Sequence, residues 1–165
     1  MVIQSSKAAG EASPKAFAAP AIDEGERTAL EVSKGILYVG IDLGTSRSAI
    51  SASNGARECV ASVVGWPRDS ISTKLRGKAA LFGVEALDKR LSLETVFPLH
   101  NGSLAYPDHK GEMSQKLHMA AQELLNHLVS LARPRKDQLI YALLSAPAEA
   151  NRKDKQGLLD IARNA

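Results

Sequence analysis

A short polar segment at residues 42–46 combines residue types that could hold an anionic group. It follows an apolar run and consists of Asp42, Leu43, Gly44, Thr45 and Ser46. Glycine lets a backbone approach anionic oxygens closely, while backbone N–H groups and the two hydroxyls can donate hydrogen bonds to them. The segment therefore predicts a phosphate-binding turn.

Asp42 adds a metal function to this hypothesis, because it stands at the carboxyl end of the apolar run. Magnesium prefers carboxylates and keeps several of its waters, so Asp42 could orient a Mg²⁺ ion through the water shell of the ion. A single carboxylate cannot bind the ion tightly. An ordinary hairpin with a polar tip explains an isolated Asp-x-Gly-Thr string equally well, so the surrounding elements must decide between the two.

Three successive strands would present this turn at one end of a sheet. Residues 36–42 form an apolar, β-branched run that is typical of a buried central strand. Residues 47–53 and 56–64 flank Asn54-Gly55, a pair typical of a two-residue hairpin turn. Trp66-Pro67 closes the third strand, since proline lacks the N–H that a strand ladder needs. The sequence predicts three antiparallel strands.

The C-terminal part predicts an α/β arrangement. Apolar residues recur at spacings of three and four over residues 113–132, which indicates a long helix with one core-facing stripe. Residues 139–144 are a short apolar run after that helix, so we expect a strand that is parallel to the first one through a crossover. Residues 148–165 show a second helical pattern.

Two segments are expected to lie outside the sheet. Residues 1–34 have too few apolar side chains to build a buried face, so we predict a disordered arm before a folded domain over residues 35–165. Residues 68–105 are predicted to form a small inserted subdomain, with a hairpin near Gly77 and a short helix over residues 84–91.

Composition excludes several classes of protein. No stretch approaches the ~20 apolar residues needed to cross a bilayer, so no transmembrane segment is expected. The net charge of +3 comes from scattered basic residues with few aromatic neighbours, which argues against a nucleic-acid partner. Cys59 is the single cysteine, so an internal disulfide is excluded, and we expect it to be a small buried residue on a strand.

Three separated stretches together resemble the actin-like family. Residues 39–46 look like the first phosphate motif that actins share with heat-shock chaperones and sugar kinases. Residues 82–90 and 97–102 resemble the actin pattern of Gly-x-Glu-Ala before an aromatic-Pro segment, and residues 146–152 resemble its Ala-Pro-x-x-x-x-Asn-Arg stretch. The resemblance implies an α/β, ribonuclease-H-like (actin-type) half: a mixed sheet of three antiparallel strands plus a parallel strand, with flanking helices and an inserted subdomain.

Within that family, residues 62–69 and their continuation to residue 104 most resemble the magnetosome-organising branch of the bacterial actins. The resemblance covers residues 36–165 and implies the N-terminal domain of an ATP-binding filament protein of the bacterial cytoplasm and cytoskeleton. It implies ATP and Mg²⁺ as cofactors, held at residues 42–46. The implied partners are further copies of the chain, full-length actin-like subunits and magnetosome-associated proteins.

Two departures limit what the resemblance implies. Ala49 stands near the place where conventional actins have a lysine after the phosphate turn. The second phosphate motif of the family, its catalytic residue and its adenosine motif would all lie beyond Ala165, so no catalytic residue is assigned. Because hydrolysis needs groups from two facing lobes, we predict negligible ATPase activity from this chain alone.

Three alternatives stay open. The chain could be a naturally short half-actin that docks on or caps a full-length filament protein, or a chaperone-type nucleotide-binding domain of the same superfamily. A metal-dependent nuclease would use Asp42 together with Glu123 of the long helix. Ser145, rather than a carboxylate, follows the fourth strand, which leaves few anionic ligands for such chemistry.

The other polar and aromatic residues have simpler explanations. His118 and His127 are nine positions apart, unlike the four of a helical metal pair, so surface or partly buried positions are expected. Trp66 is expected to anchor the base of the insertion. Actin insertions contact neighbouring subunits at this place, but we expect only a solvated basic tip from Lys74, Arg76 and Lys78.

Overall fold

The computed structural model of the chain describes residues 2–4, 35–68, 79–100, 103–104, 111–146, 150 and 152–164. The hairpin predicted near Gly77 and most of the predicted arm, residues 5–34, lie outside the described residues. Among those that are described, no helix is both long and apolar enough to cross a membrane.

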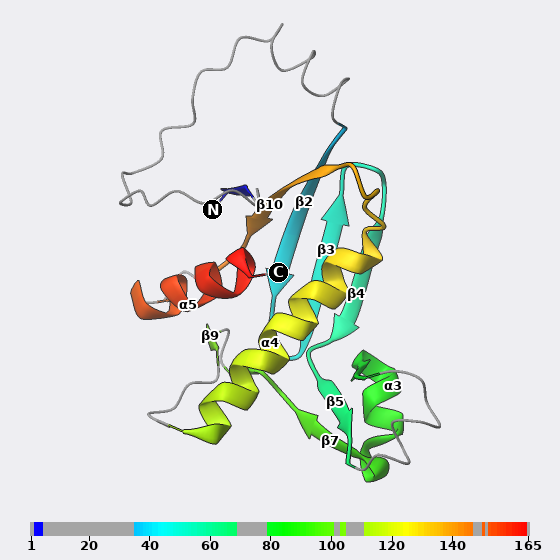
Figure 1. Cartoon of the computed structure of the whole chain (residues 1–165), viewed down its shortest axis with the longest axis vertical. Helices are drawn as coiled ribbons and strands as arrows, with labels where there is room; N and C mark the ends of the chain where they lie inside the picture. Colours follow the sequence, from blue (N-terminus) through cyan, green and yellow to red (C-terminus); the bar gives the residue numbers. More distant parts are fainter. Residues whose placement is uncertain are drawn as a thin grey trace, which may run out of the picture.

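The larger sheet has the strand order β1-β10-β2-β3-β4 (Figure 1). Its strands are β1 (Val2–Gln4), β2 (Ile36–Leu43), β3 (Arg47–Ala52), β4 (Arg57–Ala61) and β10 (Leu139–Leu144). β2, β3 and β4 are antiparallel neighbours, while β10 runs parallel to β2, with Leu144 opposite Ile41. The predicted mixed sheet is confirmed, and β2 lies in its middle.

The two faces of this sheet differ, because successive side chains of a strand point to opposite faces. On β2, Leu37, Val39 and Ile41 are buried. Tyr38, on the other face, is 45% exposed, and Leu143 of β10 is 51% exposed. β2 is therefore central, as predicted, but it is buried on only one face in the described part of the chain.

Two helices cover the buried face. α4 (Glu112–Leu131) confirms the predicted long helix, and α5 (Arg152–Arg163) follows β10. Both helices contribute to one core with β2 and β3, and Gln122 of α4 donates a hydrogen bond of 3.4 Å to the carbonyl oxygen of Ile161. The stripe of buried residues on α4 is Ala120, Ala121, Leu124, Leu125 and Leu128.

Asn54 holds the β3–β4 hairpin against the end of α4. Its Oδ1 accepts a hydrogen bond of 3.1 Å from the N–H of Ala56, and its Nδ2 donates one of 2.8 Å to the carbonyl oxygen of Ala132. Gly55 has φ +91°, which glycine adopts without strain. The hairpin is confirmed, although its loop is longer than two residues because Ser51 pairs with Arg57.

A second, smaller sheet has the order β6-β5-β7. We call the described residues from 63 to 96 the small subdomain. Its elements are β5 (Val64–Pro67), β6 (Leu81–Phe82), α3 (Gly83–Asp88), the 3₁₀ turn η1 (Arg90–Ser92) and β7 (Leu93–Val96). A core cluster of four buried residues lies here, made of Val63, Leu81, Ala86 and Leu93.

The bounds of this insertion differ from the predicted 68–105. The predicted third strand is split, because the N–H of Val63 bonds to the carbonyl oxygen of Ala61 at 2.8 Å and the chain bends there. The insertion therefore begins at residue 63, whose side chain lies in the small core. It also ends early, since Leu99 and Leu104, in the short hairpin of β8 (Leu99–His100) and β9 (Ser103–Leu104), pack in the main core.

Two further expectations need correction. Residues 2–4, predicted to be part of a disordered arm, form β1, which pairs antiparallel with β10 so that Ile3 lies opposite Ala142. Cys59 lies on a strand, as predicted, but it is exposed instead of buried. The reason is its place on β4, an edge strand, where it lies opposite Ala49 on the open face of the sheet.

Candidate functional site

The segment at residues 42–46, called here the polar turn, connects the central strand to its antiparallel neighbour. Asp42 and Leu43 end β2, and the chain bends through Gly44, Thr45 and Ser46 before β3 begins. Asp42, Thr45 and Ser46 are exposed, whereas Leu43 is buried in the main core. The five predicted residues thus lie together at one end of the sheet, but Leu43 presents only its backbone there.

Gly44 is required by the close approach of the chain to itself. A Cβ atom added at this position would collide with the backbone carbonyl oxygen of Arg47, at a separation that real Cβ atoms do not show. A backbone atom cannot swing away as a flexible side chain can. Any side chain at residue 44 would therefore reshape the turn.

Two buried serines support the turn from inside the molecule. Ser62 Oγ donates a hydrogen bond of 2.6 Å to the carbonyl oxygen of Gly44 and lies 2.8 Å from Ser48 Oγ. The two side chains are 1% and 0% exposed, respectively. Sequence reasoning assigned no function to either serine. One signal was present: Ser48 is a polar residue at an inward-facing position of β3, opposite Leu43.

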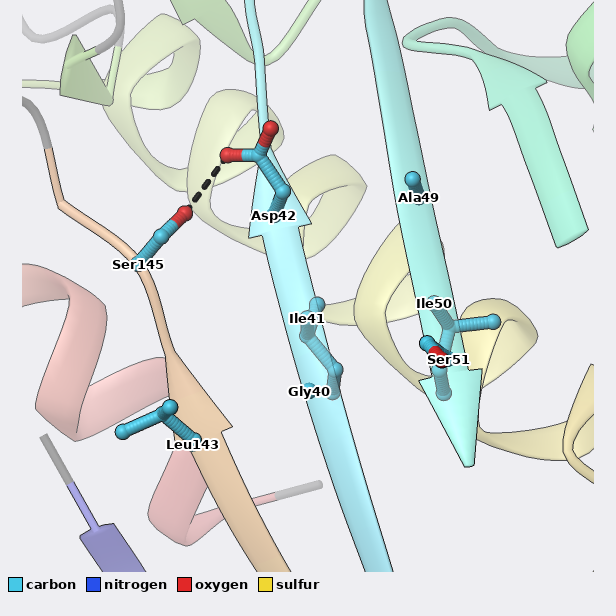
Figure 2. A pocket seen from close by; sticks show the side chains of 8 residues that line it. All are labelled: Gly40, Ile41, Asp42, Ala49, Ile50, Ser51, Leu143 and Ser145. Carbon is cyan, nitrogen blue, oxygen red and sulfur yellow. Dashed lines mark hydrogen bonds between the residues drawn. The ribbon is translucent and has the colours of Figure 1, made fainter. Parts of the chain in front are cut away.

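Ser145 orients Asp42 from the neighbouring parallel strand. Its Oγ donates a hydrogen bond of 2.5 Å to Asp42 Oδ1, drawn as the dashed line in Figure 2. The N–H of Ser145 is also fixed, by a bond of 2.9 Å to the carbonyl oxygen of Ile41. Short hydrogen bonds to a carboxylate are among the stronger ones in proteins. Ser145 therefore limits the directions in which the Asp42 carboxylate can point.

A shallow open depression of about 300 Å³ lies beside Asp42 on the exposed face of the sheet (Figure 2). Ala49 faces the depression from β3. Its small side chain lies near the place where conventional actins have a lysine. The residues that line it are Gly40, Ile41, Asp42, Ala49, Ile50, Ser51, Leu143 and Ser145.

The nuclease alternative is contradicted by the position of Glu123. Its Oε2 accepts a hydrogen bond of 2.8 Å from Trp66 Nε1, and α4 covers the buried face of the sheet while Asp42 lies on the open one. The described residues contain no group of three His, Cys, Asp or Glu side chains that could hold a metal ion. His127 instead stacks on Phe82, with ring centroids 4.2 Å apart.

Comparison with known proteins finds similarity to actin-like proteins. No protein-family profile matches the chain. It is 37% identical over 142 residues to the actin-like protein MamK of Paramagnetospirillum magneticum, covering 86% of this chain and 38% of that protein. MamK of Magnetospirillum gryphiswaldense matches with 37% identity over 142 residues, and 37% of its length is covered. The chain thus spans well under half the length of these relatives.

Solved structures support the same fold. A MamK double helical filament matches with a TM-score of 0.70 and 36% identity, covering 79% of this chain and 38% of that one. A non-polymerising MamK mutant bound to AMPPNP gives a TM-score of 0.70 and 36% identity over 80% of this chain and 39% of that one. MreB5 of Spiroplasma citri, at 20% identity and a TM-score of 0.55, shows the fold alone. The predicted actin-type fold is confirmed.

Proposed function

The chain is a partial homologue of the MamK actin-like proteins, and we propose that it is the N-terminal, nucleotide-binding lobe of a filament protein of this kind. The polar turn is the part of this lobe that contacts the phosphates of ATP. The observation that carries the proposal is the pairing of a fixed turn with an oriented carboxylate. Gly44 allows the turn, and Ser145 orients Asp42 beside it.

The position of the turn in the sheet supports this assignment. Ligands of open α/β sheets bind beyond the carboxyl ends of strands, where neighbouring connections diverge. The polar turn follows the carboxyl end of β2, and β10, which is parallel to β2, ends at the same edge of the sheet. Backbone N–H groups of residues 44–46 and the hydroxyls of Thr45 and Ser46 would donate to phosphate oxygens. With Ala49 in place of a lysine, these groups carry more of the interaction.

The residues present also fit an ATP-bound Mg²⁺ ion. Asp42 is exposed, lies at the carboxyl end of β2, and has one oxygen engaged by Ser145. It would hold the ion through water, as magnesium commonly is held. When bound, the ion neutralises charge on the phosphates. The relative whose structure contains AMPPNP supports a nucleotide as the ligand.

The cellular part of the proposal rests on the relatives. Because a MamK relative forms a double helical filament, we infer that this lobe takes part in self-association or joins full-length actin-like subunits in a cytoplasmic, cytoskeletal filament. Contacts with magnetosome-associated proteins, and a function in organising magnetosomes, belong to the same inference. Because hydrolysis needs groups from two facing lobes, we infer that ATP hydrolysis requires a second lobe together with this one.

Calorimetry with Mg-ATP tests the proposal. The samples are this chain and a chimera in which the part of MamK that the chain does not cover is fused to it. We expect tight binding by the chimera, weak binding by the chain, and loss of binding when Asp42→Ala is placed in the chimera. Asp137→Ala, an exposed carboxylate whose oxygen lies 3.4 Å from Arg135 Nε, is the matched control and should bind normally.

Two results would contradict the proposal. Equal, tight affinity of the chain and the chimera would show that one lobe suffices. Unchanged binding by the Asp42→Ala chimera, with normal folding by circular dichroism, would reduce the polar turn to an ordinary hairpin.

A further inference from the structure

We propose that Ser62 couples the polar turn to the small subdomain, so that a ligand on the turn changes how firmly the subdomain is held. The identity of that ligand rests on the proposed function above. The coupling itself rests only on contacts within the chain, so the two can fail separately.

Ser62 bonds both ends of the bend in the polar turn. Its hydroxyl donates a hydrogen bond of 2.6 Å to the carbonyl oxygen of Gly44, and its backbone N–H donates one of 3.0 Å to the carbonyl oxygen of Ser46. In the proposed function, Gly44 and Ser46 begin and end the part of the chain whose N–H groups would donate to the ligand. A shift of either carbonyl group must therefore move Ser62 or break one of these bonds.

Ser48 fixes the direction of the Ser62 hydroxyl. A serine hydroxyl has one hydrogen, and Ser62 uses it on the Gly44 carbonyl, which can only accept. The bond of 2.8 Å between the two serine oxygens must then be donated by Ser48. Because both side chains are buried, water cannot replace these bonds without opening the core. Ser62 is consequently held in one orientation.

The same residue leads directly into the small subdomain. Ser62 and Val63 are the whole connection between β4 of the large sheet and β5 of the small one. Val63 is 0% exposed and lies in the core of the small subdomain, and its carbonyl oxygen accepts a bond of 3.1 Å from the N–H of Gly83, the first residue of α3. A displacement at Ser62 can therefore reach α3 through the backbone of one residue, Val63, and one hydrogen bond.

This arrangement gives Ser62 more than a space-filling function. A buried serine that only satisfied two neighbours would stabilise the fold equally whatever the turn did. If Ser62 instead couples the polar turn to the link between the two sheets, the effect of a change in the turn should depend on whether Ser62 is intact. Such mutual dependence, measured by a double-mutant cycle, is the evidence that a coupling claim requires.

The first test needs no ligand and uses the 165-residue chain. Amide hydrogen exchange of β5, β7 and α3 is measured after the turn is loosened by Ser46→Gly, which keeps the carbonyl group that Ser62 contacts. We expect exchange in these elements to rise by roughly two- to thirtyfold. Ser62→Ala keeps the backbone bond to Ser46 and removes only the hydroxyl bond to Gly44, so in this background the additional effect of Ser46→Gly should become smaller.

Two further variants separate coupling from stability. Ser62→Thr keeps the hydroxyl, so the effect of Ser46→Gly on the small subdomain should return to its wild-type size. Ser48→Ala removes the buried partner of Ser62 but neither of the bonds from Ser62 to the turn, so the effect of Ser46→Gly should also be kept. If Ser46→Gly has the same effect with and without the Ser62 hydroxyl, Ser62 is only a buried polar residue and the inference is wrong. Should Ser46→Gly unfold the chain, Thr45→Gly makes the same comparison.

The second test adds the probe Mg-AMPPNP to the chimera. We expect slower exchange in β5, β7 and α3 of the wild-type protein and a smaller change in Ser62→Ala. Nucleotide binding without any change in the small subdomain would overturn the inference and leave the proposed function standing. Absence of binding would overturn the proposed function, while the ligand-free test still decides on the coupling.

Discussion

The large sheet and the small subdomain are held together by different means. Two helices pack on the large sheet and bury a continuous core that includes β2, β3 and β10. The described core of the small subdomain contains only Val63, Leu81, Ala86 and Leu93. Since stabilisation scales with the apolar area removed from water, the smaller core contributes less. We infer that the small subdomain depends on contacts that it makes with the larger unit.

Those contacts converge on α4, which passes from the large sheet to the small one in Figure 1. Trp66 Nε1 of β5 donates to Glu123, and Phe82 of β6 stacks on His127. Lys116 Nζ lies 2.9 Å from an oxygen of Glu94 on β7. Each strand of the small sheet therefore has a side-chain contact with the same helix.

The comparison predicts different outcomes for one substitution made in each core. Leu124→Ala, in α4, should lower the free energy of unfolding of the whole chain by about 2–5 kcal/mol, the range for buried leucines. Leu93→Ala removes an equally buried leucine from the small core, and both residues are 0% exposed. We expect it chiefly to speed hydrogen exchange in β5, β6 and β7, with a smaller change in global unfolding by urea.

A shift of the urea midpoint as large for Leu93→Ala as for Leu124→Ala would break the comparison. The two regions would then unfold as one unit.

Loss of the Trp66 contact should have an intermediate effect. Trp66→Phe keeps most of the aromatic surface but removes the donor to Glu123, and a hydrogen bond to a charged group contributes about 1.5–3 kcal/mol. We expect exchange in β5 to rise while exchange in β2 stays constant. In a Glu123→Leu background the substitution should have little further effect, and an undiminished effect would show that Trp66 acts through packing alone.

The smallest effect is expected at Lys116. Its ammonium donates a hydrogen bond to Glu94 and is attracted by that carboxylate, which together raise the pKa of Lys116 above 10.5. A raised folded-state pKa means that the contribution to stability is fully present below 10.5 and is lost as the pH rises through the folded pKa. Lys116→Met should therefore destabilise β7 slightly at neutral pH and not at all at strongly alkaline pH.

Salt provides the control for this prediction. Exposed ion pairs are screened, so raising the ionic strength should shrink the difference between the wild-type protein and Lys116→Met. A difference that persists in strong salt and at alkaline pH would mean that the methylene groups of the lysine, and not its charge, hold β7 to α4.

The two regions also differ in how well the sequence predicts them. β2, α4 and β10 have strong apolar patterns over six or more residues, and all three lie where those patterns indicate. The small subdomain has strands of two to four residues, too short for any periodicity to be visible. Its first strand was merged with β4 because the bend at Val63 is made by the backbone, without a glycine or proline to mark it.

In the candidate site, residues that are neighbours in sequence could be proposed from the sequence, whereas their partners from distant strands could not. The five residues of the polar turn could be proposed as a site from the sequence because they are contiguous and their types fit one kind of chemistry. Ser145 was noted only as an unsuitable metal ligand, yet it contacts Asp42 from 103 positions away in sequence. Ser62 is 18 positions from Gly44, on another strand connection. Partners of this sort depend on strand register, which the sequence does not reveal locally.

The exposed thiol of Cys59 offers a practical consequence. Because the chain has one cysteine, a maleimide dye would label a single known position, with no need to remove competing sites. That position is the cross-strand neighbour of Ala49, which lines the depression beside Asp42. A fluorophore there would stand at the mouth of the candidate site, and its emission would report the arrival of a ligand in real time.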